Sequence, residues 1–314
     1  MKKILITGGG GFIGSHIVEA LQEYNEITIL DDFTQNAIQY LGDISDITLI
    51  KGSVLDRELL TEIEKETDFD IVIHMAAIAG VKFVEGNPTK TMMVNLIGTY
   101  NVLETFKEAN LERFVNFSTS EVYGTRAVFM SEEDDTTQGA IGKPRPNYAV
   151  SKISAEHLGY TYMQEYGLPF VSIRPYNCFG SRQIGGGSVR IFTEQAVKGE
   201  NLVVFGDGMG IRCYCYVSDF MDGLLATLEK PEAIGQVFNI GNPYEPIASI
   251  TLAKKIIALA NSDSQIIFDR TKKEDVLVRI PKIEKAQRIL NFEPKVSLEE
   301  GLKKTIEWWR ERNV

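Results

Sequence analysis

The fold is decided by the stretch ILITGGGGFIG, which runs from Ile4 to Gly14. A short β-branched run precedes four glycines, and a helical pattern follows them. Gly8, Gly11 and Gly14 fall three residues apart. The loop can therefore turn tightly, bring backbone amides against a pyrophosphate and let the helix pack closely on the strand. This order of strand, glycine loop and helix predicts a dinucleotide-binding unit.

The next expected strand, Glu26–Leu30, ends in a pair of aspartates at the distance expected for a ribose-binding carboxylate. Asp31 would accept hydrogen bonds from the adenosine ribose and repel a 2′-phosphate, and no arginine follows within residues 33–36. We therefore expect NAD rather than NADP as the cofactor. The loop and this strand end predict cofactor contacts at Gly8, Gly11, Phe12, Ile13, Gly14, Asp31 and Asp32.

Working outward, short β-branched runs alternate with helical stretches through the first half of the chain. The expected strands are Ile4–Thr7, Glu26–Leu30, Thr48–Lys51, Asp70–His74 and Arg113–Ser118, and the expected helices are Gly14–Glu23, Arg57–Lys65, Thr89–Ala109 and Tyr148–Glu165. Strands separated by helices pair in parallel through crossover connections. The sequence thus predicts the α/β class, with a doubly wound parallel sheet of the Rossmann type.

The sequence pattern changes after Arg174. Glycine-rich loops interrupt shorter strands and helices, and this pattern continues to an amphipathic tail at Leu298–Arg312. We expect an NAD-binding domain over residues 1–174 and a smaller C-terminal substrate-binding region over residues 175–314. The two are interleaved, and the boundary is approximate.

Composition narrows the function classes. The 314 residues are 44% hydrophobic and carry a formal net charge of −10 without a long basic run, which argues against nucleic acid and membrane partners. The apolar run Ile4–Ile6 is too short for a signal peptide. Three cysteines lack zinc spacing, and Cys213–Val217 alternates like a buried strand, so we expect no metal and a cytoplasmic location.

Tyr148 and Lys152 are spaced to share one helix face. A lysine ammonium beside a phenol, helped by the positive nicotinamide ring, stabilises the phenolate and lowers its pKa from about 10 toward working pH. Tyr148 then becomes a candidate general base. A Tyr-x-x-x-Lys pair by itself is common and usually structural, so its meaning depends on the surrounding motifs.

Those motifs lie at other strand ends. The expected strand ending at Ser118 runs into the sequence TSEVYG from Thr119, and HMAA from His74 and RPYN from Arg174 follow two more. Together with the glycine loop, they resemble the extended short-chain dehydrogenase/reductase family of nucleotide-sugar epimerases, dehydratases and decarboxylases. The resemblance covers essentially the whole chain. It implies a recycled NAD and a nucleotide-diphosphate-sugar substrate, with UDP as the expected nucleotide.

The resemblance also implies roles for single residues. Thr119 bonds the 4-oxygen of the sugar, Tyr148 removes its proton, and NAD takes the C4 hydride, while Lys152 holds the nicotinamide ribose. Ala76 is expected at the cofactor, and Asn95 as a structural bridge. The residues matching positions that contact the nucleotide diphosphate are Asn177, Arg212 and Arg279.

The fate of the 4-ketone depends on Glu121 and Ser120. The triplet Thr119-Ser120-Glu121 resembles 4,6-dehydratases, in which the glutamate takes the C5 proton and a neighbour protonates the leaving hydroxyl. We therefore expect 4,6-dehydration first, although serine is a weak acid. UDP-glucuronate decarboxylases share the triplet, and the sequence from Ala76 to Val81 is similar to UDP-glucuronate 4-epimerases, so both reactions remain open. Glu121 could also be a solvated or capping acid.

A remote alternative is a non-catalytic NAD-sensing scaffold, which should have lost Tyr148, Lys152 or Thr119. All three are present. The helices expected at Thr89–Ala109 and Tyr148–Glu165 carry apolar residues on more than one face, and the family resemblance implies a homodimer formed through them.

Overall fold

The computed structural model describes residues 1–142, 144–271 and 276–312. These residues form two compact units. Unit 1 comprises Met1–Val122, Gln138–Arg174 and Leu224–Phe238, and unit 2 comprises Tyr123–Thr137, Pro175–Gly223 and Asn239–Val314. The chain therefore passes from one unit to the other repeatedly, and one of these passages follows Arg174.

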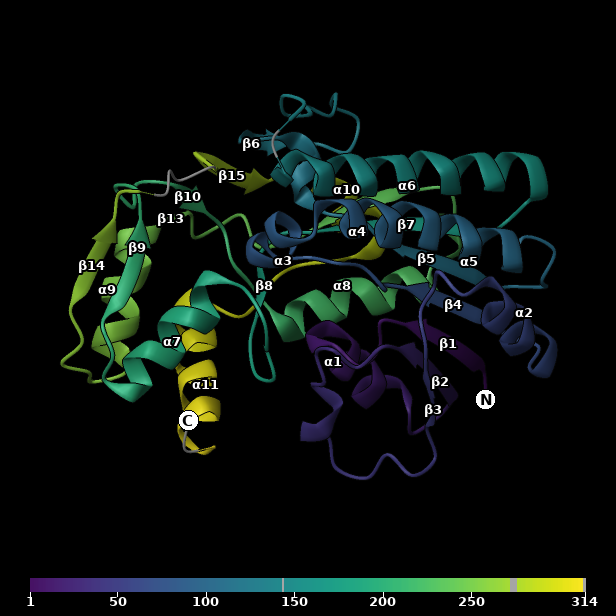
Figure 1. Ribbon diagram of the computed structural model, residues 1–314, viewed down its shortest axis with the longest axis horizontal. Coiled ribbons are helices and arrows are strands. Elements are labelled where there is room, and N and C mark those ends of the chain that lie inside the picture. Colours follow the sequence, from purple (N-terminus) through teal and green to yellow (C-terminus); the bar gives the residue numbers. More distant parts are fainter. Residues whose placement is uncertain (143, 272–275, 313–314) are drawn as a thin grey trace. The chain divides into compact units, whose positions relative to one another are not determined.

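A seven-stranded sheet organises unit 1 (Figure 1). Its strands are β1 (Lys3–Thr7), β2 (Glu26–Asp31), β3 (Thr48–Lys51), β4 (Ile71–His74), β5 (Arg113–Phe117), β7 (Phe170–Pro175) and β12 (Val237–Ile240). The strand order is β12-β7-β5-β4-β1-β2-β3, and each neighbouring pair from β3 to β7 is parallel. The chain runs outward from β1 in both directions, which confirms the predicted doubly wound Rossmann-type sheet.

The helices of unit 1 cover this sheet. They are α1 (Phe12–Leu21), α2 (Arg57–Glu66), α3 (Val81–Gly86), α4 (Pro88–Met92), α5 (Gly98–Phe106) and α6 (Pro144–Tyr166), with a 3-10 turn η1 (Ile38–Tyr40). Helix α5 contacts both α2 and α6, and α4, α5 and α6 run together in Figure 1. Strand residues such as Val72 and Phe114 pack with Leu60, Phe106 and Tyr162 in one buried cluster. This burial fixes the helices to the sheet.

Three helices differ clearly from the sequence prediction. Helix α6 begins at Pro144, four residues before the expected start at Tyr148. The helix expected over Thr89–Ala109 contains a π-helical turn, η2 (Met93–Ile97), between α4 and α5, and α5 ends at Phe106. Helix α1 begins at Phe12, two residues before the expected start, because the extended Gly11 is its N-cap and the Ser15 amide already bonds the Gly11 carbonyl at 2.9 Å.

Unit 2 contains smaller sheets. The strands β6 (Arg126–Met130), β10 (Ile211–Arg212), β13 (Ile247–Ala248) and β15 (Val278–Pro281) form a four-stranded sheet, while β8 (Cys178–Phe179) pairs with β11 (Cys215–Tyr216) and β9 (Leu202–Phe205) with β14 (Ile266–Asp269). Its helices are α7 (Ser188–Lys198), α9 (Ser249–Leu259), α10 (Glu284–Leu290) and α11 (Leu298–Arg310). Helix α11 confirms the expected C-terminal helix. The chain also forms η3 (Ser120–Tyr123), α8 (Val217–Glu229) and η4 (Pro231–Ala233).

The strand predicted over Cys213–Val217 is wrong in extent. Only Cys215 and Tyr216 are in a strand, and α8 begins at Val217. All five side chains of this segment are buried, so the alternation seen in the sequence is not an alternation of exposure. Tyr216 is covered because its ring packs edge-on against Phe179 of the partner strand at 5.6 Å.

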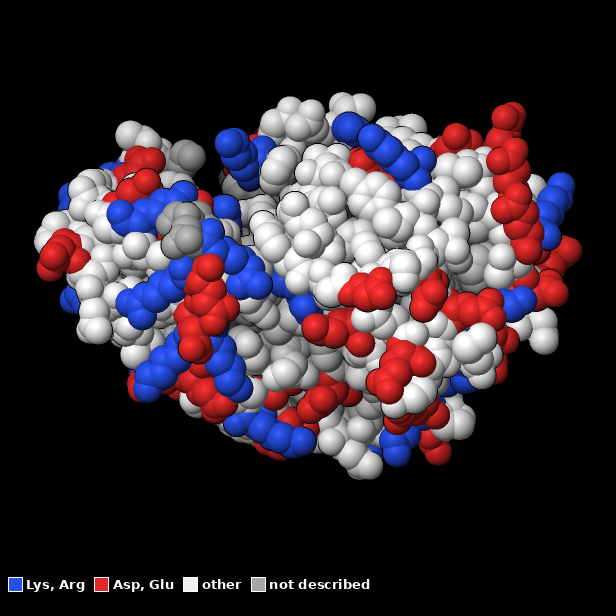
Figure 2. Space-filling model, turned by 90° about the horizontal axis from the view of Figure 1, so that it is seen from below, with Lys and Arg blue, Asp and Glu red and all other residues white. Residues whose placement is uncertain are grey.

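The surface carries both signs of charge. On the face drawn in Figure 2, acidic and basic side chains are interspersed rather than separated into one acidic and one basic region. In the part of the chain that the structure describes, no helix has the length and apolar character required to cross a bilayer.

Candidate active site

The glycine loop brings three segments of backbone into close contact. Gly8 has a φ of 77°, and a Cβ there would lie 2.6 Å from the Ala76 nitrogen. A Cβ at Gly14 would lie 2.3 Å from the Gly9 carbonyl oxygen. Side chains at these two positions would collide with backbone, which cannot move aside cheaply. The predicted cofactor residue Ala76 therefore lies directly against the glycine loop.

Gly11 is different from its neighbours. A Cβ at Gly11 would find only the Gly8 oxygen within 4 Å, at 3.6 Å. The space beside Gly11 is thus open at the start of α1, where orphan amides favour a phosphate. This open position is what a bound pyrophosphate requires. Phe12 and Ile13 form the first turn of the same helix.

Asp31 lies beside the loop as the sequence predicts. Its carboxylate accepts hydrogen bonds from the Gly10 amide at 2.9 Å and from the Phe33 amide at 2.7 Å. Burial raises the pKa of Asp31, and these two bonds oppose the rise. Asp32 is exposed and caps a local turn by accepting from the Thr34 amide at 2.9 Å. The glycine loop and Asp31 together fit the pyrophosphate and adenosine ribose of NAD, whereas a contact from Asp32 stays a prediction.

A buried histidine supports the strand ends beneath the loop. The Thr99 hydroxyl donates to the Asn95 carbonyl at 2.7 Å, so its oxygen accepts from Nε2 of His74 at 2.9 Å. Nδ1 of His74 then accepts from the Thr7 hydroxyl at 2.7 Å. Burial, aided by the charge of Lys152, lowers the pKa of His74 to about 3. The imidazole is therefore a neutral connector between β1, β4 and α5.

Asn95 lies in the π-helical turn and bridges two elements. Its Oδ1 accepts from the Ile78 amide at 2.7 Å, and its Nδ2 donates to the Ile78 carbonyl at 3.1 Å and to Oγ of Ser151 at 3.2 Å. The Ser151 hydroxyl in turn donates to the Tyr148 carbonyl at 2.8 Å. These contacts confirm the expected bridging role. They join the loop after β4 to the turn of α6 that carries Tyr148.

Helix α6 positions the two residues that the sequence paired. Tyr148 is half-buried, and Lys152 is 2% exposed one turn later. Nζ of Lys152 donates to the Phe117 carbonyl at 2.6 Å, at the end of β5. Burial lowers the pKa of Lys152 to about 8, and the carboxylate of Glu156 opposes that shift. Lys152 is thus a buried cation at neutral pH beside the candidate base.

The predicted triplet begins two residues after the end of β5, with Ser118 between them. Thr119 and Ser120 are buried, and Glu121 is half-buried in the η3 turn. The Glu121 amide donates to the Thr119 hydroxyl oxygen at 3.2 Å. This bond uses an acceptor lone pair of Thr119, whose hydroxyl proton can still be donated to a substrate oxygen. Lys152 binds the strand two residues before Thr119, so the structure brings the catalytic helix and the triplet to the same strand end.

A buried ion pair next to Lys152 was missed in the sequence. Nε of Arg174 donates to Oε1 of Glu156 at 2.9 Å, and Nη2 donates to Oε2 at 2.6 Å. The side chains are 5% and 6% exposed. The signal that could have found it is the spacing of Glu156, four residues after Lys152 on a helix, together with an arginine ending a strand.

Unit 2 holds the residues predicted at the nucleotide diphosphate. Arg212 on β10 and Arg279 on β15 are register partners on parallel strands, so their side chains leave the same face of the sheet. Nδ2 of Asn177 donates to the Cys213 carbonyl at 2.8 Å, next to Arg212. Arg279 is 5% exposed, and its Nη2 donates to the Gly124 carbonyl at 3.0 Å. The structure thus brings the three residues together within unit 2.

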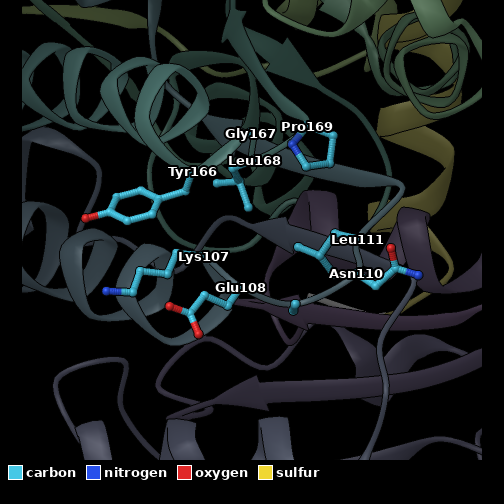
Figure 3. Close-up of a pocket in the computed structure, with 9 residues that line it drawn as sticks. Lys107, Glu108, Asn110, Leu111, Tyr166, Gly167, Leu168 and Pro169 are labelled. Carbon is cyan, nitrogen blue, oxygen red and sulfur yellow. The ribbon is translucent and has the colours of Figure 1, made fainter.

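A pocket lies elsewhere in unit 1 (Figure 3). Its volume is 390 Å³, and its lining comes from the segments Lys107–Leu111 and Tyr166–Pro169, which follow α5 and end α6. These segments precede β5 and β7, so the pocket lies at the amino-terminal edge of the sheet, opposite the strand ends just described. None of the candidate site residues lines it.

Comparison with known proteins gives the family. The family model "NAD dependent epimerase/dehydratase family" matches residues 4–241. The chain belongs to this family. The match spans the glycine loop, the triplet and helix α6, and it confirms NAD as the cofactor.

Relatives in the family carry out different reactions. The chain is 35% identical to a UDP-N-acetyl-α-D-glucosaminuronate decarboxylase of Bacillus cytotoxicus, over 99% of this chain and 98% of the relative. It is 34% identical to a dTDP-D-glucose 4,6-dehydratase of Dictyostelium discoideum, over 83% of this chain and 62% of the relative. The structure of a UDP-glucuronic acid 4-epimerase from Bacillus cereus, in complex with UDP-glucuronic acid and NAD, matches with a TM-score of 0.89 and 29% identity, covering 99% of both chains. The family is therefore one of NAD-dependent enzymes that modify nucleotide sugars.

Proposed function

We propose that the protein decarboxylates a UDP-linked hexuronate through a transient 4-ketone, with NAD recycled in each turnover. One observation carries the proposal: a buried Lys152, one turn from Tyr148, is bonded to the strand that delivers Thr119. This arrangement supplies a phenol, a buried cation and a hydroxyl donor for the chemistry at C4.

The first step is removal of hydrogen from C4 of the sugar. Thr119 donates a hydrogen bond to the 4-oxygen, and Tyr148 as phenolate accepts the proton of the 4-hydroxyl. The Lys152 ammonium stabilises that phenolate. When bound, NAD supplies the hydride acceptor for C4 and later returns the same hydride.

The second step depends on the substituent at C5. In a 4-keto-hexuronate, the carboxylate is β to the ketone, so breaking the C5–C6 bond releases carbon dioxide and sends the electron pair into the 4-carbonyl. Protonation at C5 then restores the ketone. This route needs no acid for a leaving hydroxyl, which suits a chain that has Ser120 rather than a carboxylic acid there. The buried Ser120 therefore moves decarboxylation ahead of the dehydration that the sequence placed first.

The relatives also support this order. The decarboxylase of Bacillus cytotoxicus aligns over nearly the full length of both chains, and the Bacillus cereus epimerase structure contains a UDP-hexuronate. Dehydration is the second candidate, and the observation that favours it is Glu121, half-buried beside Thr119, where it could take a C5 proton.

The remaining roles are proposed for the glycine loop and for the three polar residues of unit 2. Gly8, Gly11, Gly14 and Ala76 hold the pyrophosphate side of NAD, and Asp31 holds its adenosine ribose. Arg212 and Arg279 bind the substrate diphosphate through planar guanidinium groups, which match phosphate oxygens in pairs, and Asn177 supports them.

We also propose a homodimer that pairs α5 and α6 with the same helices of a second copy. Met93 and Ile97 in η2, next to α5, and Tyr100 in α5 are each more than a third exposed, and Tyr160 on α6 is 45% exposed. Size-exclusion chromatography with light scattering tests this proposal, and a monomer at micromolar concentration would contradict it.

The reaction is tested by incubating the purified protein with UDP-glucuronate, with UDP-N-acetylglucosaminuronate, and with UDP-, dTDP- and GDP-hexoses. The masses of the products are then measured. Loss of carbon dioxide from a UDP-hexuronate supports the proposal. Loss of water from a hexose would assign dehydration, and an isomer of unchanged mass would assign epimerisation. The variant Tyr148→Phe is the control, and we expect its turnover to fall at least about 100-fold while NAD remains bound. Full activity of this variant would remove Tyr148 from the mechanism.

A further inference from the structure

Three side chains recur at intervals of four residues on helix α6, namely Tyr148, Lys152 and Glu156. This spacing places them along one face of the helix. Lys152 bonds the carbonyl of Phe117 on β5, and Glu156 receives two hydrogen bonds from Arg174 on β7. Two successive turns of the helix are therefore tethered to two strands by charged side chains.

The two tethers attach at neighbouring points of the sheet. β5 and β7 are parallel neighbours, and Phe117 is the register partner of Ile173, the residue before Arg174. Thr119 lies two residues beyond Phe117. The tethers thus define the position of α6 along and above the strand end that carries Thr119, and with it the position of Tyr148.

The charged groups around Lys152 also indicate that Glu156 supports it. The titratable and charged groups near it are Tyr148 and Glu156 on α6, His74 on β4, and Arg174 on β7 through Glu156. His74 is neutral at working pH. Glu156 is the carboxylate that opposes the loss of the Lys152 proton, and its two bonds to Arg174 fix the orientation of that carboxylate.

We propose that Glu156 and Arg174 are positioning residues, whose buried ion pair keeps Lys152 in its ammonium form and holds α6 where Tyr148 faces Thr119. Neither residue touches the reacting atoms in this proposal. The inference rests on the proposed roles of Tyr148 and Lys152 and extends them to the groups that maintain them.

The test uses variants that separate charge from geometry. Removing Glu156 alone would leave Arg174 as a buried unpaired cation, and the protein could fail to fold. The double variant Glu156→Leu/Arg174→Met instead replaces the pair with apolar side chains of similar size, a change that buried ion pairs often tolerate. Arg174→Lys keeps both charges but loses the paired geometry.

A matched control is available on the same helix. The Tyr162 hydroxyl of α6 donates to Oε2 of Glu104 at 2.6 Å, so Glu104→Gln weakens a tether of α6 and removes one negative charge away from Lys152. The NAD-bound protein is used throughout, and the pH dependence of kcat/KM and of kcat is measured with the UDP-sugar that the wild type converts.

In the double variant we expect the alkaline limb of the profile to move down by about one pH unit, because Lys152 loses its proton earlier. In Arg174→Lys the limb should stay in place, while kcat falls about 10-fold at nearly constant KM because Tyr148 is misplaced. Glu104→Gln should resemble the wild type in both. An unmoved limb in a folded double variant would overturn the proposal.

A second measurement does not depend on turnover. The ultraviolet difference between the NAD-bound protein and its Tyr148→Phe variant follows ionisation of Tyr148 alone. We expect the double variant to lower the ionised fraction of Tyr148 at pH 8 about threefold, because Lys152 gives up its proton instead. If the wild type converts no UDP-sugar, the proposed function fails, but this titration still decides on the ion pair. Identical titrations in the wild type and the double variant would overturn it.

Discussion

His74 at the end of β4 and Lys152 on helix α6 are both buried bases of unit 1, but they differ in charge state. His74 lies between the hydroxyls of Thr7 and Thr99, and burial lowers its pKa to about 3. Lys152 bonds a carbonyl and has Glu156 one turn away, and its pKa stays near 8 despite the same burial. One base is therefore neutral and the other is a cation at neutral pH.

The difference in charge between the two bases matches the requirements of the two regions. Beneath the glycine loop, shape matters: Gly8 and Gly14 let backbone approach backbone, and a neutral imidazole joins the strand ends without adding a charge. On α6, charge matters, because a phenolate needs a cation beside it. A buried cation persists only where a carboxylate compensates part of the desolvation. Burial lowers both pKa values, but the ordinary pKa of lysine, 10.5, lies far above the 6.5 of histidine, and Glu156 opposes part of the shift of Lys152. Only Lys152 therefore keeps its proton at neutral pH.

Replacing Lys152 with methionine should produce the largest effect of the variants that test this contrast. We expect Lys152→Met to lower turnover at least about 1,000-fold, because Tyr148 loses the cation that stabilises its phenolate. The same change should raise the free energy of unfolding at pH 7 by roughly 1–3 kcal/mol, because a buried charge is removed. Turnover assays and urea titrations measure the two effects.

The pH dependence gives the sign of the stability effect. The folded pKa of Lys152, about 8, lies below its ordinary value of 10.5, so the unfolded chain holds this proton more tightly. The cost of the buried ammonium is thus fully present below pH 8 and fades as the pH approaches 10.5, and the gain in Lys152→Met should fade with it. The exposed Lys90 supplies the control, and Lys90→Met should change stability by less than about 0.5 kcal/mol. A destabilised Lys152→Met at pH 7 would contradict the account.

The sequence predicted the fold well where local patterns are long. The glycine loop and the alternation of strands and helices were sufficient for the doubly wound sheet, because each crossover repeats the same chemistry. Local patterns did not reveal the π-helical turn at Met93–Ile97. That turn coincides with the contacts that Asn95 makes to Ile78 and Ser151, which are distant in the sequence.

In and around the candidate site, too, local features could be predicted from the sequence, whereas contacts between distant segments could not. Local features were sufficient at the start of α2, where Asp56 directly precedes the helical stretch and caps it by accepting from the Leu59 amide at 3.0 Å. The spacing of Glu156 after Lys152 marks it as a candidate, but its pairing with Arg174 also depends on the register between α6 and β7, which no local pattern gives. Likewise, Arg212 and Arg279 become neighbours only when β10 and β15 pair.

Two glycine variants test whether the glycine loop is shaped by close backbone contacts at one position and by space for the cofactor at another. In Gly14→Ala, the new Cβ meets the Gly9 oxygen at 2.3 Å, so we expect a loss of roughly 1–3 kcal/mol in unfolding free energy and loss of NAD binding. In Gly11→Ala, the Cβ meets no atom closer than 3.6 Å, and φ is −77°. This variant should fold with nearly unchanged stability.

The NAD affinity of Gly11→Ala then shows whether the open space at Gly11 is used by the cofactor, separately from any effect on stability. Gly11→Ala should weaken NAD binding at least about 10-fold, because its methyl group occupies the space expected for the pyrophosphate. Calorimetric titration with NAD and urea unfolding measure the two quantities. If Gly11→Ala bound NAD as tightly as the wild type, the pyrophosphate would have to lie elsewhere.

The neutral state of His74 gives the smallest expected effect. Its folded pKa, about 3, lies below its ordinary value of 6.5, so the unfolded chain binds a proton that the folded chain excludes. Its contribution to stability is complete above pH 6.5 and decreases as the pH falls, by at most about 1.4 kcal/mol per pH unit. In His74→Asn, the unfolding free energy should therefore fall less steeply between pH 6.5 and pH 4.5 than in the wild type.

The exposed His157 on α6 provides the matched control, since it is a histidine of the same unit that lies at the surface. His157→Asn should keep the wild-type slope, whereas His74→Asn should reduce it, even if both variants lose some stability at pH 7. Urea titrations at several pH values compare the slopes. An equal slope in the wild type and in His74→Asn would mean that His74 takes up a proton in the folded state, and the contrast between the two buried bases would then disappear.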